Sequence, residues 1–456
     1  MIWEITDIPN TVKMNFPNTR FLVMDPLFAL FIAPRLFKSK FRNMPMIPVI
    51  SPEAGLFFYP DNFDTVVPMH SLPRISFFLT VVWSVLFGLH FYIWARLIRD
   101  MGVLEPWKTR LTLLLITLGI LIPSGLILTR FAPRVLLAPV MWVIYTWLGM
   151  AFFLNVLLAV TDLAKYLAVI LPVGLRDRPV DPERRLFLAQ LAGGIVLFSN
   201  FGISLAGLIG ATASAVQVKK VKVGLRNLPA ELEGYRIAQI SDLHVGPTIG
   251  HDFMETIVSK VNELAPDLVA ITGDLVDGTL EQLRKHTDPL RDLRADDGVF
   301  FVTGNHEYYV GDVDEWMDYL RDMGIRVMRN ERVTIQKGFE LAGTDDISAR
   351  GGDHGQNIPK ALEGRNKNIP VVLMAHQPRS FKEAKSLGVD LQLSGHTHGG
   401  QIFPFHYVVA LFEPYLAGLY QKGNSQLYVS RGTGYWGPPM RLGAPAEITE
   451  ITLSRG

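Results

Sequence analysis

The pattern of apolar and polar positions changes character at about residue 214. Before it, four long segments lack formal charge, at residues 75–95, 111–129, 135–161 and 186–218. Each approaches or exceeds the roughly 20 apolar residues that a helix needs to cross a bilayer. The alternative, buried core helices of a soluble protein, is disfavoured because soluble cores rarely sustain uncharged segments of this length. The pattern therefore predicts four transmembrane helices.

Beyond residue 214, short apolar runs alternate with amphipathic segments. The expected buried strands are residues 235–240, 266–272, 298–303, 369–375 and 389–394. The expected helices between them are residues 250–264, 279–293, 313–323 and 379–387. Strands that alternate with helices are typical of an α/β domain. We therefore expect three regions: an irregular N-terminal segment (1–74), a four-helix transmembrane domain (75–213) and an α/β domain (214–456).

The N-terminal segment gives no comparable signal. Residues 1–74 are rich in proline and aromatic residues, show no sustained period and contain no clear secretory signal. Their most apolar stretch, residues 21–33, is too short and too interrupted to span a bilayer. Met69 stands just before the first long apolar run, so one hypothesis is that the functional chain begins near it.

Composition narrows the possible functions. Hydrophobic residues make up 49% of the 456 positions, the formal net charge is +1, and there is no cysteine. Disulfides and thiolate metal sites are therefore excluded. The chain has no basic tract interleaved with aromatic residues, so no nucleic-acid partner is expected.

Lysine and arginine predict how the chain is oriented in the membrane. The first and third connections carry the larger group: Arg96, Arg99, Lys108, Arg110, Lys165, Arg176, Arg178, Arg184 and Arg185. The second connection and the segment after the fourth apolar run carry the smaller group: Arg130, Arg134, Lys219, Lys220 and Lys222. Because positive residues favour the cytoplasmic side, we expect a multi-pass cell-membrane protein whose α/β domain is extracytoplasmic.

Polar residues that can bind metal follow five of the predicted strands. They are Asp242 and His244; Asp274 and Asp277; Asn305, His306 and Glu307; His376; and His396 and His398. Each motif alone has an ordinary interpretation as a turn, a loop or the start of a helix. Together they matter more, because ligand sites of α/β sheets form at the carboxyl ends of strands. Nitrogen and oxygen ligands without sulfur suit manganese, iron or zinc.

The order of these motifs carries a family resemblance. D-x-H, G-D-x-x-D, G-N-H-E, a lone histidine and G-H-x-H follow one another within residues 220–456. This set resembles the calcineurin-like metallophosphoesterase superfamily. The preceding apolar segments, with the terminal stretch YVSRGTGYWGPPMRLGAPAEI, resemble the membrane-attached branch of that superfamily.

The resemblance implies an αββα sandwich that binds two divalent ions of manganese, iron or zinc. The residues that it assigns to the first ion are Asp242, His244, Asp274 and His398. The residues that it assigns to the second ion are Asp274, as the bridge, with Asn305, His376 and His396. His306 matches the residue that donates a proton to the leaving oxygen or stabilises the transition state. Two such ions clamp the attacking and leaving oxygens, and a water between them becomes the nucleophile.

Other residues near these motifs have two interpretations each. Asp277 either orients a ligand histidine or lies in a surface turn. Glu307 is either a residue that orients a ligand or a plain loop charge. Arg431, with Tyr435 and Trp436, either contacts the phosphate and an apolar part of the substrate or packs within a glycine-rich loop.

These observations predict a membrane-anchored, metal-dependent phosphoesterase that hydrolyses phosphodiester, phosphomonoester or pyrophosphate bonds. An outward-facing site beside the bilayer favours a lipid-linked substrate, while soluble phosphodiesters and nucleotides remain open. The alternative is a non-enzymatic membrane sensor or scaffold with a metal-binding domain. The complete ligand set, with His306, favours the enzyme.

Overall fold

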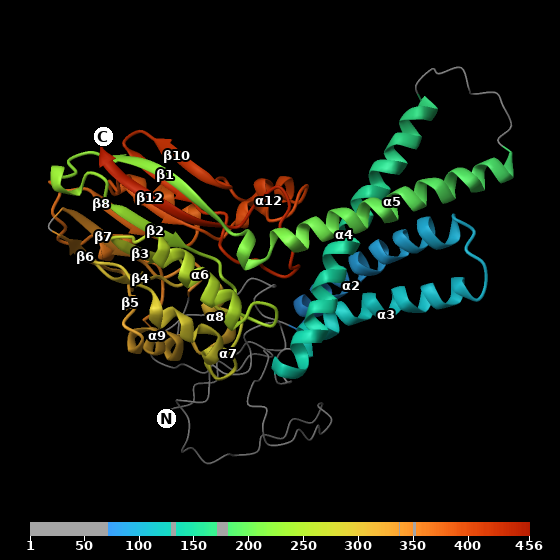
Figure 1. The fold of residues 1–456 in the computed structure, drawn as a ribbon, viewed down its shortest axis with the longest axis horizontal. Coiled ribbons are helices and arrows are strands. Elements are labelled where there is room, and N and C mark those ends of the chain that lie inside the picture. Colours follow the sequence, from blue (N-terminus) through green and yellow to red (C-terminus); the bar gives the residue numbers. More distant parts are fainter. Residues whose placement is uncertain (1–71, 129–133, 171–180, 337, 350–352) are drawn as a thin grey trace, which may run out of the picture. The chain divides into compact units, whose positions relative to one another are not determined.

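The computed structural model describes residues 72–128, 134–170, 181–336, 338–349 and 353–456 (Figure 1). The chain divides into two compact units, Met1–Leu79 and Thr80–Gly456. Of the first unit only the start of one helix is described, so the expectation for residues 1–74 lies almost entirely outside the described residues. The second unit contains nearly all of the described helices and strands.

Four helices correspond to the four apolar segments. They are α2 (Leu72–Trp94), α3 (Trp107–Leu128), α4 (Arg134–Ile170) and α5 (Pro182–Gly210). All four are long and apolar enough to cross a membrane, which confirms the predicted helices. Asp181 caps the last of them by accepting a hydrogen bond from the Glu183 N–H, and Pro182 suits the first helical position. The fourth uncharged segment extends to residue 218, but α5 ends at Gly210 and a strand begins at Gln217.

The four helices are apolar outside and more polar inside. Phe198 and Phe87 are 81% and 71% exposed, whereas His90, Asn200 and Ser204 are buried. The Trp147 indole N–H donates to His90 Nε2 over 3.1 Å. Helices that expose apolar side chains and bury polar ones are suited to a lipid environment, where helices associate through packing and hydrogen bonds.

Two six-stranded sheets form the remainder of the described chain. The first has the order β1 (Gln217–Leu225), β12 (Glu447–Arg455), β2 (Arg236–Ile240), β3 (Leu268–Ile271), β4 (Val299–Phe301), β5 (Arg326–Val327). The second has the order β10 (Gly418–Lys422), β11 (Ser425–Val429), β9 (Leu391–Ser394), β8 (Val371–Met374), β7 (Phe339–Gly343), β6 (Glu331–Ile335). Strands β2 to β5 are mutually parallel, as are β7, β8, β9 and β11.

The sheets pack face to face between two helical layers (Figure 1). Ile237 and Leu268 of the first sheet share a buried core with Val372 and Leu393 of the second. The helices α6 (His251–Glu263), α7 (Leu280–Thr287) and α9 (Val313–Asp322) cover the outer face of the first sheet. The helices α10 (Ile358–Ala361) and α11 (Phe381–Ser386) cover the second. The predicted αββα sandwich is confirmed, and all five predicted buried strands are present.

The long helices contact the α/β domain directly. Met440 is completely buried and shares a cluster with Phe153 of α4 and with Ile402. A Cβ atom added at Gly149 or Gly207 would meet the Met440 side chain, so these glycines permit the close approach.

Candidate metal centre

The carboxyl ends of five strands bring the predicted ligands together. Strands β2, β3 and β4 are parallel neighbours in one sheet, and β8 and β9 are parallel neighbours in the other. The two sheets are joined here, because the His376 Nδ1 lies 2.8 Å from the Thr272 carbonyl oxygen. The His396 N–H donates to Asp242 Oδ1 across the same gap, over 2.8 Å.

One cluster of three side chains can hold a metal ion. Asp242, His244 and His398 are all buried, and each offers a ligand atom within 4.8 Å of the others. The Nε2 atoms of the two histidines lie 3.0 Å apart. Three of the four residues that the family resemblance assigned to the first ion thus lie together.

A second cluster is formed by Asp274, His376 and His396, again with ligand atoms within 4.8 Å of one another. Asp274 also reaches the first cluster: its Oδ2 lies 3.1 Å from His376 Nε2 and 3.8 Å from His244 Nε2. One carboxylate oxygen therefore faces ligands of both clusters, which is the position that a bridging ligand requires.

Backbone strain is concentrated in these loops. Ten non-glycine residues of the described chain have a positive φ, and five of them are predicted ligands: Asp242, His244, Asp274, His396 and His398. Such conformations are costly for residues with a Cβ atom and cluster at functional sites. The fold therefore maintains these loops against a local conformational preference.

The donors fit divalent metal ions. Among the described residues, Asp242 Oδ2 and Asn305 Oδ1 are buried oxygens without a hydrogen-bond partner. Buried polar atoms are nearly always partnered, so two free oxygens that belong to the predicted ligands favour a cation at this place. A Cβ atom at Gly395 would collide with Ser241 and Asp242, so only glycine allows the His396 loop to approach them.

Asp277 links two histidines of the site. Its Oδ1 lies 2.8 Å from His244 Nδ1 and 2.7 Å from His306 Nδ1. Burial alone would raise the pKa of the Asp277 carboxyl, but the imidazoles of His244 and His306 lower it below its usual range. These contacts support the interpretation in which Asp277 orients a ligand histidine over the one in which it lies in a surface turn.

His306 lies beside the shared carboxylate and is partly accessible to solvent. Its Nε2 lies 3.9 Å from Asp274 Oδ2, and 13% of its side chain is exposed. Burial lowers the pKa of His306, but Asp274 and Asp277 outweigh it and raise that pKa to about 9. The Trp436 ring lies 6.2 Å from the His306 ring, centroid to centroid.

Glu307 holds the backbone of two loops at the site. Its buried carboxylate accepts hydrogen bonds from the N–H groups of Gly304 (2.6 Å), Asp274 (3.1 Å) and Leu275 (2.7 Å). Burial and the neighbouring Asp274 raise the pKa of Glu307 to about 7. This side chain fixes the loop that presents the shared carboxylate.

Two arginines make contacts near the loop that contains His398. Arg431, a substrate candidate, forms an ion pair with Glu447 over 3.0 Å. The sequence analysis did not identify Arg441 as a candidate. Its side chain is buried at the site and donates to the carbonyl oxygens of His398 (2.9 Å) and Arg431 (2.7 Å). No local signal marks Arg441, because its partners are distant in sequence.

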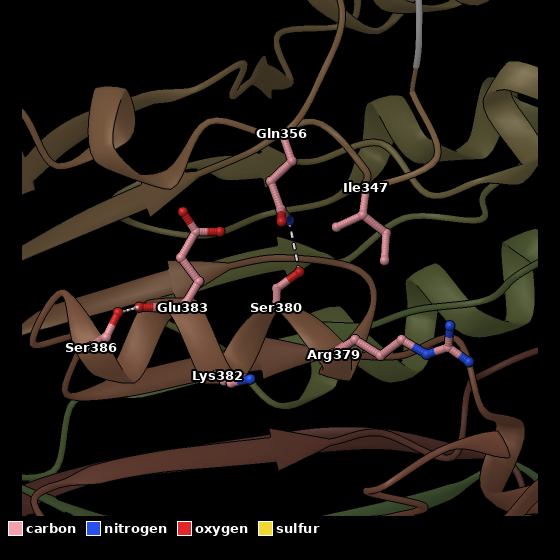
Figure 2. A pocket seen from close by; sticks show the side chains of 7 residues that line it. All are labelled: Ile347, Gln356, Arg379, Ser380, Lys382, Glu383 and Ser386. Carbon is pink, nitrogen blue, oxygen red and sulfur yellow. Dashed lines mark hydrogen bonds between the residues drawn. The ribbon is translucent and has the colours of Figure 1, made fainter. Parts of the chain in front are cut away.

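A cavity of about 420 Å³ lies outside the ligand set, beyond the His376 loop. Its lining residues are Ile347, Gln356, Arg379, Ser380, Lys382, Glu383 and Ser386. Figure 2 shows the Gln356 amide directed at the Ser380 hydroxyl, to which it donates over 2.7 Å. Its charged lining residues are Arg379, which pairs with Glu413, together with Lys382 and Glu383.

Comparisons with known proteins agree with this geometry. The family model for calcineurin-like phosphoesterases matches residues 235–400. The transmembrane protein with metallophosphoesterase domain of Danio rerio is 40% identical over 265 residues, which cover 56% of this chain and 60% of the relative. The alignment with the corresponding Bos taurus protein covers 64% of that relative. The chain thus spans less than two thirds of the length of these two relatives.

A bacterial relative is covered more completely. An uncharacterized metallophosphoesterase of Helicobacter pylori is 37% identical over 310 residues, which cover 66% of this chain and 82% of the relative. Among solved structures, a dimetal phosphatase from Danio rerio covers 44% of this chain and 88% of its own, with 12% identity and a TM-score of 0.31. By the family match and the extent of the bacterial relative, the chain belongs to the calcineurin-like metallophosphoesterase family.

Proposed function

We propose that this chain is a membrane-anchored phosphoesterase with two divalent ions of manganese, iron or zinc. The single observation that carries the proposal is the pair of ligand clusters that meet at Asp274 Oδ2. The first ion is assigned to Asp242, His244, Asp274 and His398. The second is assigned to Asp274, Asn305, His376 and His396.

Each group of the chain then has a distinct task. The two ions, when bound, polarise the phosphoryl oxygens and supply a hydroxide nucleophile at neutral pH. His244 and His376 have their Nδ1 atoms engaged by Asp277 and by the Thr272 carbonyl, which leaves Nε2 free as the ligand atom. The glycines of the histidine loop leave room for the phosphate.

His306 is the proton donor in this proposal. Asp277 fixes its Nδ1, so the proton available for transfer is on Nε2, the atom that faces the shared carboxylate. An imidazolium there can neutralise the charge that develops on a leaving alkoxide and then protonate it.

The proposal includes a lipid-linked substrate and an extracytoplasmic α/β domain. The contacts of Met440 and Ile402 with the helix that contains Phe153 support an active centre close to the bilayer. The distribution of lysine and arginine supports the orientation. Because the chain has no cysteine, a single cysteine can be introduced at Lys108 or at Lys422. Labelling of each variant in intact cells by a maleimide that does not cross the membrane shows which side the residue faces. We expect labelling at residue 422 and none at residue 108.

The central experiment measures hydrolysis of an aryl phosphodiester and the matching monoester. The full-length chain in vesicles is freed of metal and reloaded with Mn²⁺, Fe²⁺ or Zn²⁺. Metal-dependent turnover that disappears in Asp274→Asn would support the enzyme, and the diester-to-monoester ratio would narrow the substrate class. A folded, metal-loaded protein that turns over neither these esters nor lipid phosphoesters would favour the second candidate, a metal-binding membrane sensor.

A further inference from the structure

An exposed apolar segment follows the loop that contains His396 and His398. Residues 403–412, which we call the apolar arm, include the short helix α12 (His406–Phe412), which has no buried residue. Leu411, Phe412 and Tyr407 are 80%, 70% and 63% exposed, and Phe403, Phe405 and Val408 are also exposed. The arm has no formally charged residue. Contiguous exposed apolar side chains of this kind mark an interaction surface.

Both ends of the arm are fixed at the metal centre. At its start, a Cβ atom on Gly400 would collide with His406, so the arm packs directly against the loop of His398. Just beyond its end, Glu413 Oε1 lies 3.9 Å from His396 Nε2 and 2.7 Å from Arg379 Nη2. The position of the arm is therefore tied to that of two predicted ligands.

The arm packs against α4, a helix long enough to span a membrane. The Phe405 ring packs edge-on against Phe152 of α4, with centroids 6.0 Å apart. Ile402, which precedes the arm, shares a cluster with Phe153. Trp142 and Val143 of α4 are also exposed. An apolar surface that begins on such a helix and extends onto the arm requires the same apolar medium.

We propose that the apolar arm inserts into the interfacial layer of the bilayer and holds the metal centre at the level of lipid headgroups. The occupant of this surface is the lipid membrane itself. Apolar contact with the acyl boundary, combined with nearby cations, is the physical basis of interfacial binding. Arg379 lies beside the arm, where it donates to the Phe412 carbonyl oxygen over 3.1 Å and pairs with Glu413.

The inference deepens the proposed function, on which its second test rests. A phosphoester that stays anchored in the bilayer meets the centre at its own depth, whereas a soluble ester must diffuse to it. The arm thus selects substrates by the chain attached to the phosphate and not by the phosphate itself. Leu411 and Phe412, the most exposed side chains of the arm, are the specificity-determining residues.

The first test measures depth and needs no activity. Leu411→Cys is spin-labelled in the full-length protein in vesicles of phosphatidylcholine and phosphatidylglycerol. Leu113→Cys on α3 is the lipid-facing control, and Glu281→Cys on α7 is the water-facing control. We expect the label at residue 411 to collide with oxygen more than with a water-soluble nickel chelate, as at residue 113. Access like that at residue 281 would overturn the proposal. So would shielding from both reagents, which would indicate a second copy or another protein.

The second test compares two substrates with the same scissile bond. Hexadecyl para-nitrophenyl phosphate enters the vesicles, and ethyl para-nitrophenyl phosphate stays in solution. In the double variant Leu411→Asp/Phe412→Asp we expect kcat/KM for the hexadecyl ester to fall about tenfold or more, because charge opposes interfacial insertion. The ethyl ester should be hydrolysed as before, and Phe412→Leu should retain both activities.

The outcomes separate the two proposals. An unchanged hexadecyl-to-ethyl ratio in the double variant would overturn the role of the arm and leave the phosphoesterase standing. A wild-type protein that hydrolyses neither ester, but whose label at residue 411 lies in lipid, would count against the phosphoesterase and support the membrane contact.

Discussion

The two ligand clusters have similar composition but different surroundings. In the first, His244 is backed by the charged carboxylate of Asp277, and only 10% of the His398 side chain is exposed. In the second, His376 is backed by a neutral carbonyl, and 24% of the His396 side chain is exposed. A carboxylate behind a histidine raises its basicity as a ligand. The two clusters therefore differ in the groups that hydrogen-bond to their ligand histidines. We expect the first cluster to bind its ion more tightly.

The largest effect is expected where the clusters meet. Asp274→Asn removes the charge that both ions would share, so we expect kcat to fall about a thousandfold or more, the scale of losing a major electrostatic contact. Metal analysis should show that both ions bind more weakly. The exposed Asp318→Asn serves as the control. Loss of only one ion would show that Asp274 belongs to one cluster alone.

His306→Ala should separate chemistry from metal binding. We expect kcat for an alkyl leaving group to fall about a hundredfold to ten-thousandfold, the usual range for a general acid. A para-nitrophenyl ester should lose much less, because its leaving group needs no proton. Metal content should not change in either cluster. Equal losses for both esters would contradict the role of proton donor.

Asp277→Asn should weaken metal binding in the first cluster only. Because Asp277 contacts His244 and no predicted ligand of the second ion, we expect the affinity of the first cluster to fall about 10–100-fold. The second cluster should keep its affinity. Competition titrations with a chromogenic chelator measure both values, and equal weakening would argue against separate support.

Glu307→Gln should weaken both clusters equally, because Glu307 holds the backbone of the shared Asp274. Its buried hydrogen bonds also stabilise the fold, so we expect a loss of about 1–3 kcal/mol in the free energy of unfolding. Urea denaturation measures this loss, with the half-exposed Glu331→Gln as control. An unchanged stability would show that the carboxylate contributes little to this loop.

The smallest effect concerns the order of metal release. Because His396 is the more exposed ligand, a chelator should remove the second ion first and give two phases of release. A stopped-flow measurement of the released ion distinguishes two phases from one. A single phase would mean that exposure does not set the rate.

Long uncharged runs sufficed to predict the four long helices, and short apolar runs sufficed to predict the five strands that end at the site. The polar residues after those strands predicted that they would converge on one place, and the family resemblance implied their division into two clusters. Long-range partners were not predictable. Asp345 and Asp346 have the composition of a turn, but both are buried, because Arg329 pairs with Asp345 and the Gln377 amide donates to Asp346. Arg441 contacts His398 only because the chain returns to the site late in the fold.

The link between α5 and β1 has one further consequence. The helix ends at Gly210 and the strand begins at Gln217, so the described chain has no long tether here. In the membrane-anchored protein proposed above, a catalytic domain on so short a link cannot sample the aqueous volume. For a substrate held in the same bilayer, encounter becomes a two-dimensional search, and turnover would follow the number of substrate molecules per unit area and not their bulk concentration.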